Sequence, residues 1–78
     1  RNPMRMRYAI EQRLRMIDFL LNQYGSVNRS ALEDYFGIST PQASADIAEY
    51  LRLAPSNAAY DKGRKTYTRT SAFKRLWN

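Results

Sequence analysis

The sequence predicts a mainly α-helical domain in which three helices precede a small two-stranded β-hairpin. Apolar residues recur at spacings of three and four in three segments, as they do along the buried face of an α-helix. Glycine or proline ends each of these segments. Two short runs of strand-forming residues follow, separated by a polar turn. We expect residues 1–78 to form a single domain whose core covers about residues 8–70.

The first helix is predicted over about residues 7–24. Its apolar stripe consists of Ile10, Leu14, Ile17, Leu21 and Tyr24. Gly25 follows directly, and glycine commonly ends a helix because it adopts positive φ without strain. A helix lying on a membrane surface is the alternative for a basic amphipathic segment, but the rest of the chain offers elements for this helix to pack against.

The second helix is predicted over residues 29–36. Asn28 is its expected N-cap, because the side-chain oxygen can accept a hydrogen bond from a free amide of the first turn. The residues expected to be buried are Ala31, Leu32, Tyr35 and Phe36. We expect this helix to stop at Gly37.

The third helix is predicted to begin after Ser39 and to end before Pro55. Ser39 and Gln42 have the capping-box spacing, in which the serine oxygen accepts from the Gln42 amide and the glutamine side chain can reach back. Pro41 falls in the first turn, where a missing amide hydrogen is tolerated. The expected buried stripe is Ala43, Ile47, Tyr50, Leu51 and Ala54.

A β-hairpin is predicted from strands over residues 58–61 and 66–69. The polar turn between them contains Gly63, which we expect at the position that needs positive φ. Tyr60 and Tyr67 are strand formers and can pair across the hairpin.

Two further short elements are expected outside the helices and the hairpin. Val27 is an isolated β-branched residue and is predicted to form a short strand. In the tail, Phe73, Leu76 and Trp77 have helical spacing, which predicts one or two last helical turns within residues 71–78.

The net charge of +6 favours a polyanionic partner, and the charge lies at the two ends of the chain. Residues 1–15 hold five arginines and one glutamate, and residues 58–78 hold six basic residues and one aspartate. In residues 16–57, five carboxylates outnumber two arginines. A solvated basic surface without a partner is the alternative interpretation.

Several classes of protein are excluded by composition. The chain contains neither histidine nor cysteine, so disulfides and thiolate metal sites are excluded. No glycine loop for phosphate is present, and the acidic neighbours Glu33 and Asp34 would point in different directions on a helix. We expect no catalytic residue, no metal, no cofactor and no enzymatic activity. No apolar run approaches the ~20 residues that cross a bilayer and no signal peptide is evident, so we expect no membrane partner and a cytoplasmic, nucleoid-associated protein.

The order of elements matches the plan of a winged helix-turn-helix domain. In residues 37–47 a short helix ends at glycine, one apolar residue follows, and a capped helix begins. Such a turn sets two helices at a steep angle, so the second can enter the major groove of DNA while the first contacts the backbone. We therefore predict that the third helix is the recognition helix.

Residues near the N-terminus of this helix are expected to contact base edges. They are Thr40, Pro41, Gln42, Ser44 and Ala45. Gln42 can pair bidentately with adenine, Ser44 can bond to either base type, and Pro41 or Ala45 can meet a thymine methyl. The alternative for Gln42 is that it only completes the capping box. Asp46 lies on the flank of the helix, where we expect an internal partner such as an arginine or a backbone amide.

Phosphate contacts are expected from residues outside the base-reading surface. Arg29 and Ser30 begin the second helix, and Ser39 and Thr40 can combine capping with a phosphate contact. Lys62, Arg64 and Lys65 at the hairpin tip suit the adjacent minor groove or backbone, and Arg5 and Arg7 can form an N-terminal arm. A solvated turn is the alternative for the tip.

Residues 28–32, 36–39 and 41–47 resemble the N-terminal domain of bacterial WYL-domain transcriptional regulators, within them the group that regulates phage-defence operons. The similarity continues through residues 53–55 and 60–61 to Tyr67. It includes the broader DeoR-like pattern of a serine cap and Asp-Ile in the third helix, although many DeoR-like proteins carry arginine where this chain has Ser44 and Ala45. The resemblance implies a homodimeric regulator, often a repressor, that binds inverted repeats in double-stranded DNA. It also implies a C-terminal WYL domain that would bind any effector ligand, with residues 71–78 beginning the connection to it.

Two other binding functions are alternatives to duplex recognition. A winged helix can serve as a protein-interaction module without specific DNA binding, because one fold supports several functions. Binding to single-stranded nucleic acid is less favoured, because few aromatic residues alternate with the basic ones as stacking surfaces.

Overall fold

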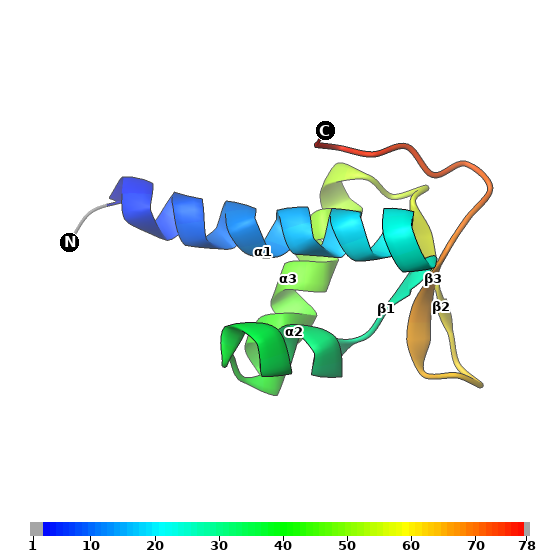
Figure 1. Ribbon diagram of the computed structural model, residues 1–78, viewed down its shortest axis with the longest axis horizontal. Helices are drawn as coiled ribbons and strands as arrows, with labels where there is room; N and C mark the ends of the chain where they lie inside the picture. Colours follow the sequence, from blue (N-terminus) through cyan, green and yellow to red (C-terminus); the bar gives the residue numbers. More distant parts are fainter. Residues whose placement is uncertain (1–2, 78) are drawn as a thin grey trace.

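The computed structural model describes the backbone of residues 3–77 and the side chains of residues 8–77. Its elements in chain order are α1 (Pro3–Tyr24), β1 (Ser26–Val27), α2 (Arg29–Phe36), α3 (Thr40–Leu53), β2 (Ala58–Asp61) and β3 (Thr66–Arg69). The long α1 runs along one side of the molecule, α3 crosses it steeply, and the sheet lies beyond the C-terminal end of α1 (Figure 1). Within residues 3–77, no helix is both long enough and apolar enough to span a bilayer. The predicted three helices and hairpin are confirmed.

Local sequence signals set the ends of the helices as predicted. Gly25 and Gly37 end α1 and α2 with φ of 81° and 65°. Asn28 and Ser39 cap the next two helices, and their side-chain oxygens each accept from the amide three residues further on, at 2.9 and 3.2 Å. Each change of chain direction therefore follows from the chemistry of one residue.

The sheet has three strands rather than the two of the predicted hairpin. Its order is β1-β3-β2, with all pairs antiparallel, and Val27 of β1 lies opposite Tyr67. Tyr67 also lies opposite Tyr60, with ring centroids 4.9 Å apart, as predicted. The expectation for Gly63 is wrong, because Lys65 is the residue of the turn with positive φ, at 54°.

The core is formed between α1, α3 and α2 and closed by the sheet. Its buried apolar residues are Leu14, Ile17, Leu21, Val27, Leu32, Ala43, Ile47, Tyr50, Ala54 and Ala58. Leu51 is half-buried, so the predicted stripe of α3 is confirmed. Four other predicted core residues are exposed: Ile10, Tyr24, Ala31 and Tyr35. In the short α2 only Leu32 is buried. The N-terminal end of α1 projects past the other elements (Figure 1).

The predicted helix in the tail is absent, and residues 70–77 form turns and irregular structure. Asp18 of α1 is fully buried, and its carboxylate accepts hydrogen bonds from the backbone amides of Leu76 (3.0 Å) and Trp77 (3.1 Å). Because these amides bind a carboxylate, they are not available for helical bonding. Phe73 and Trp77 pack against the core, so their apolar side chains are used within this domain.

Asp18 also belongs to a buried polar network that joins the tail to α3. The Tyr50 hydroxyl donates to Asp18 (2.5 Å) and accepts from Asn57 (2.9 Å). Asn57 in turn donates to the backbone carbonyl of Lys74 and accepts from its amide, at 2.8 and 3.0 Å. Burial and the hydrogen bond to Asp18 raise the pKa of Tyr50 above the usual tyrosine value. The network therefore connects α1, α3 and the tail by side-chain hydrogen bonds.

Candidate nucleic-acid interface

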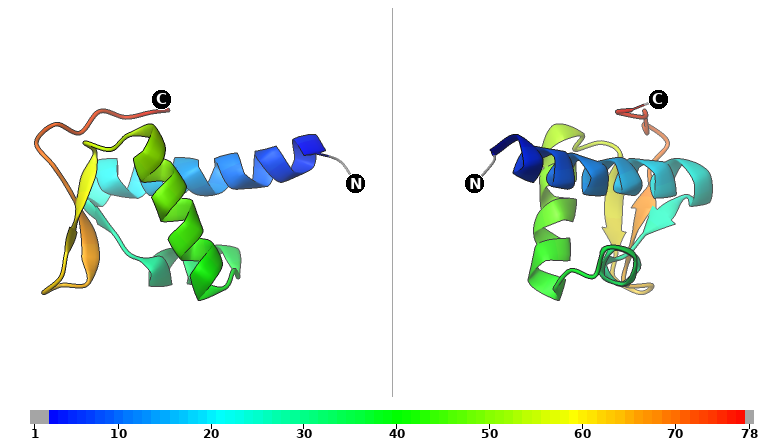
Figure 2. Two further views of the ribbon diagram at one scale, coloured as in Figure 1. Left: turned by 180° about the vertical axis from the view of Figure 1, so that it is seen from behind. Right: turned by 60° about the vertical axis from the view of Figure 1, so that its left-hand side comes forward.

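The N-terminal half of α3 presents the residues predicted to contact bases. Thr40, Pro41, Gln42 and Ala45 are exposed and Ser44 is half-buried, whereas Ala43 and Ile47 face the core. From behind the view of Figure 1, α3 lies in front of α1 with the hairpin to one side, so the outer side of α3 is open (Figure 2). The helix-turn-helix geometry thus exposes short polar and apolar side chains at the start of the recognition helix.

Arg29 and Ser30 lie exposed at the start of α2, and Arg29 also reaches α3. The Arg29 Nη1 donates to Ser44 Oγ at 3.2 Å. This contact occupies one acceptor position of Ser44 and holds the guanidinium beside the recognition helix. The remaining guanidinium N–H groups can still donate, because arginine carries five.

Gln42 has a different partner from the one predicted. Its side-chain Nε2 donates to Asp46 Oδ1 at 2.9 Å, and the amide of Gln42 is the group that binds the Ser39 cap. The side-chain half of the predicted capping box is therefore wrong. Asp46 is buried, and the predicted internal arginine is Arg13 of α1, whose Nε lies 2.5 Å from Asp46 Oδ2.

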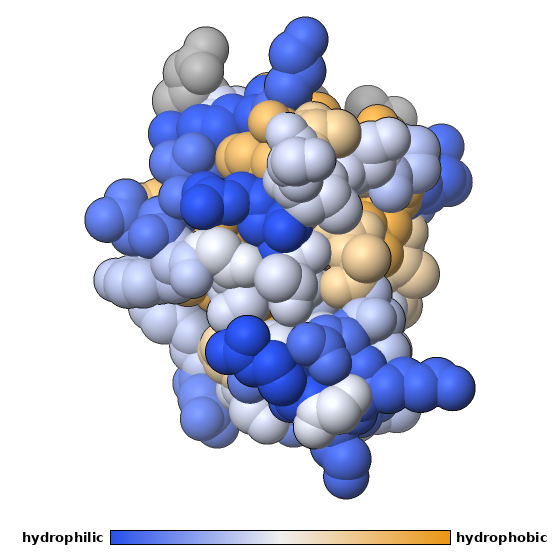
Figure 3. Space-filling view, turned by 90° about the vertical axis from the view of Figure 1, so that its right-hand side faces the viewer, coloured by the Kyte–Doolittle hydropathy of each residue, from blue (hydrophilic) through white to orange (hydrophobic). Residues whose placement is uncertain are grey.

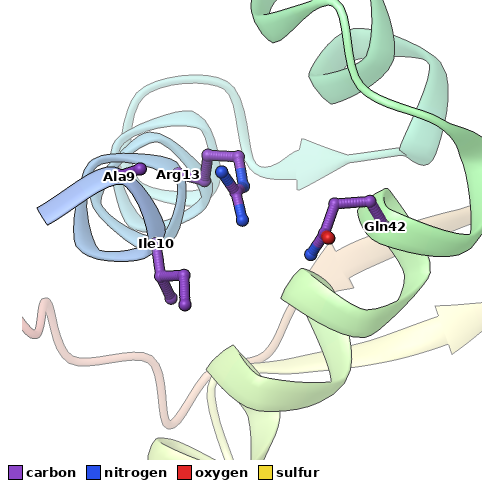
Figure 4. A pocket seen from close by; sticks show the side chains of 4 residues that line it. All are labelled: Ala9, Ile10, Arg13 and Gln42. Carbon is purple, nitrogen blue, oxygen red and sulfur yellow. The ribbon is translucent and has the colours of Figure 1, made fainter. Parts of the chain in front are cut away.

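Arg13 is a residue of this surface that sequence reasoning missed. It precedes the buried Leu14 in α1, and its side chain crosses the space between α1 and α3 toward Gln42 (Figure 4). A shallow hollow of about 200 Å³ lies beside this contact, lined by Ala9, Ile10, Arg13 and Gln42. One signal could have indicated it, because a carboxylate on the inner flank of α3 needs a cation on the helix that packs against it.

The hairpin tip carries the cations predicted for backbone contacts. Lys62, Arg64 and Lys65 are all exposed, and the amide of Arg64 donates to Asp61 Oδ1 at 3.1 Å, which fixes the turn. The tip and the N-terminal end of α3 lie at the same end of the molecule, away from α1 (Figures 1 and 2). On the face of the molecule that carries the sheet, hydrophilic residues cover the end with the hairpin tip, and apolar residues lie nearer α1 (Figure 3).

Other basic residues are engaged inside the domain or lie elsewhere. Arg52 on α3 pairs with Glu49 at 2.7 Å, and the hydrogen bond from Arg52 lowers the pKa of that carboxyl. The backbone of Arg5 and Arg7 belongs to the first turns of α1, not to an extended arm, and their side chains lie outside the described part of the chain. The helix begins at Pro3, earlier than predicted, and an arm formed by Arg5 and Arg7 stays a prediction.

This arrangement combines an open helix face, a cation at the start of α2 and a basic tip, as in helix-turn-helix proteins. Residues 9–77 match the family model described as the BrxR transcriptional regulator winged helix-turn-helix domain. The chain belongs to this family. The BrxR family match begins just after the first turns of α1 and includes the tail that packs on Asp18, so the polar network lies within the matched residues.

Curated relatives agree with the BrxR family assignment. A DNA-binding transcriptional repressor CapW from Pseudomonas aeruginosa is 49% identical over 71 residues, which cover 91% of this chain and 24% of that protein. A CapW from Escherichia coli is 46% identical over 71 residues with the same coverage, and one from Stenotrophomonas maltophilia is 43% identical over 70 residues. The chain thus spans about a quarter of the length of these relatives. The predicted resemblance to the winged helix domain of a bacterial regulator is confirmed.

Proposed function

We propose that this domain binds double-stranded DNA in a sequence-specific manner and serves a transcriptional repressor of the BrxR family. One observation carries the proposal: the open N-terminal face of α3 and the basic hairpin tip lie at the same end of the molecule. The relatives named as DNA-binding transcriptional repressors support it.

In this proposal α3, α2 and the hairpin tip each contact a different part of the DNA. The first turns of α3 enter the major groove, where Gln42 and Ala45 meet base edges. Arg29 and Ser30 bind phosphate at the start of α2. The tip residues Lys62, Arg64 and Lys65 bind the neighbouring backbone or minor groove, which adds affinity without sequence information.

The oligomeric state and the regulation belong to the longer protein. We propose a homodimer that binds an inverted repeat, with any effector bound by a C-terminal WYL domain, as the family resemblance implies. The protein would act in the cytoplasm at the nucleoid, without catalysis. Contacts from Arg5 and Arg7 remain a prediction.

The proposal is tested by selecting binding sites from random duplexes at physiological salt. We expect one enriched sequence with two-fold symmetry, and half-sites separated by about one helical turn or a multiple of it. A protein that enriches no sequence, or that binds a protein partner through α3 without binding duplex DNA, would contradict the proposal.

A further inference from the structure

Gln42 is exposed at the start of the recognition helix, yet its carboxamide is held by a partly buried ion pair. Gln42 Nε2 donates to Asp46 Oδ1 at 2.9 Å, and Asp46 is only 3% exposed. Arg13 of α1 binds the same carboxylate through Nε at 2.5 Å and Nη2 at 3.3 Å. Three side chains from two helices thus form a chain of contacts from the interior to the surface.

The ion pair decides which end of the Gln42 carboxamide faces Asp46. A carboxylate only accepts hydrogen bonds, and the Gln42 side chain carries one acceptor oxygen and one NH₂ donor. Reversing the carboxamide would place its Oε1 against a carboxylate oxygen, which is repulsive. Two nitrogens of Arg13 bind the two carboxylate oxygens and keep the carboxylate in place, so the orientation of Gln42 is fixed from α1.

The fixed orientation also limits what Gln42 can offer to a base. One of its two N–H groups is used by Asp46, which leaves one N–H donor and the Oε1 acceptor. Adenine presents one acceptor and one donor in the major groove, and this pair matches the remaining groups. Guanine presents two acceptors, N7 and O6, and a single N–H cannot satisfy both in the same way.

We propose that the Arg13–Asp46 pair is a positioning device that makes Gln42 select adenine over guanine. The inference rests on the proposed DNA-binding function and deepens it by assigning a specificity role to a residue of α1. Arg13 and Asp46 act through Gln42 and do not touch the base themselves. The positive charge of Arg13 is neutralised inside the domain and adds no phosphate contact.

The test uses the duplex sequence selected by the unaltered protein and versions in which each adenine is replaced by guanine or thymine. We expect one position at which guanine weakens binding roughly ten-fold or more. Asp46→Asn keeps the size of the side chain but offers an amide that allows Gln42 to turn. The adenine-to-guanine ratio is the affinity for the duplex with adenine divided by the affinity for the duplex with guanine at that position. Asp46→Asn should reduce this ratio to about three-fold or less and leave the base preference at the other positions unchanged.

Arg13→Gln is the second variant, because it loosens Asp46 without altering α3. It should reduce the same ratio and leave the salt dependence of binding unchanged. Arg15→Gln is the matched control, because it makes the same charge change on the same helix. Arg15 pairs with Glu11 (2.8 Å) and lies over the Trp77 ring, away from Asp46 and Gln42, so this variant should leave the ratio unchanged. In the Gln42→Ala background, Asp46→Asn should have no further effect on the ratio.

The outcomes separate the inference from the proposed function. If the unaltered protein enriches no sequence, both fail. If it enriches a sequence but Gln42→Ala changes no position, or Asp46→Asn weakens all duplexes equally or leaves the adenine-to-guanine ratio intact, DNA binding stands and the positioning role is overturned. Thermal unfolding of each variant shows whether a general loss reflects unfolding.

Discussion

Asp18 shows what a single residue can determine in a domain of this size. Its carboxylate is fully buried and binds the Tyr50 hydroxyl and two backbone amides of the tail. The Arg75 guanidinium lies further away, with Nε 3.7 Å from the carboxylate. The negative charge is therefore stabilised by three neutral donors as well as by Arg75, and each of these donors would lose its acceptor if Asp18 were removed.

We expect Asp18→Ala to lower the free energy of unfolding by roughly 3 kcal/mol, because it leaves the buried Tyr50 hydroxyl and two partly buried backbone amides without their acceptor. Urea denaturation followed by the fluorescence of Trp77, the single tryptophan of the chain, measures this change. Asp34→Ala, at an exposed position of α2, is the control and should change stability by no more than about 0.5 kcal/mol. Equal urea midpoints for both variants would show that the network contributes little.

Tyr50 should make the stability of the domain sensitive to high pH. Burial and the hydrogen bond to Asp18 raise its pKa above the usual value of 10.0, so the folded chain keeps a proton that the unfolded chain releases. The stabilisation is complete below about pH 10 and is lost as the pH rises above that value. The urea midpoint should therefore fall more steeply between about pH 9.5 and 11.5 in the unaltered protein than in Tyr50→Phe. Parallel curves would contradict the prediction.

At the level of single residues, the sequence predicted what depends on near neighbours. Asn28, Ser39, Gly25 and Gly37 act within a few residues, and all four were assigned correctly. The partners of Asp18 are 32 or more positions away in the chain, and no local pattern indicates them.

Among the elements, the turn between α2 and α3 depends most on one backbone conformation. Gly37 has φ of 65°, and a Cβ atom at this position would meet nothing within 4 Å. Replacement by alanine would therefore act through backbone strain alone, without a steric clash.

We expect Gly37→Ala to destabilise the domain by about 1 kcal/mol and to weaken DNA binding, because the angle between α2 and α3 depends on this residue. Gly63→Ala is the matched control: Gly63 does not have positive φ, and the new Cβ would lie at an ordinary 3.5 Å from Asp61 Oδ1. The control should change stability by no more than about 0.5 kcal/mol. Thermal unfolding compares the two, and an equal loss in both would argue against strain at Gly37.

Helices and strands were predicted well where a regular pattern of apolar residues extends over many positions, and less well in the short β1 strand and the tail. The bounds of α2, β2 and β3 agree with the prediction. The third strand of the sheet was missed as a partner, because Ser26–Val27 is only two residues long and its pairing with β3 is set by the packing of α1. The tail was predicted as helix because the spacing of its apolar residues is compatible with one, although its amides bind Asp18 and Asn57 instead.

For the whole molecule, the basic residues at the two ends of the chain divide into two groups in the fold. Several are used internally: Arg13 binds Asp46, Arg69 donates to the Asn22 carbonyl at 2.9 Å, and Arg75 lies near Asp18. The cations of the hairpin tip remain exposed on the side proposed to face DNA, together with Arg29 from the middle of the chain. Charge counts along a sequence cannot separate these groups, because the separation depends on which carboxylates and carbonyl oxygens the fold brings near each cation.

The tip should govern the salt dependence of binding. Changing Lys62, Arg64 and Lys65 together to glutamine is expected to weaken binding to all duplexes and to flatten the plot of log K against log [salt]. The slope should decrease by about 0.9 for each phosphate that the tip no longer neutralises. Fluorescence anisotropy at several salt concentrations measures the slope. Lys74→Gln removes an exposed charge from the tail and should leave the slope unchanged. A triple variant with the original slope would mean that the tip does not bind phosphate.

The docking of the tail on Asp18 has a consequence for how the domain opens. The amides of Leu76 and Trp77 lie in an irregular segment, where hydrogen exchange with solvent is usually fast. Both donate to the buried Asp18 carboxylate, which also binds Tyr50 of α3, so they exchange only when the tail leaves Asp18. We therefore expect these two amides to exchange as slowly as amides in the middle of α1. In kinetic terms, the last residues of the domain and its recognition helix would belong to one cooperative unit, which unfolds together.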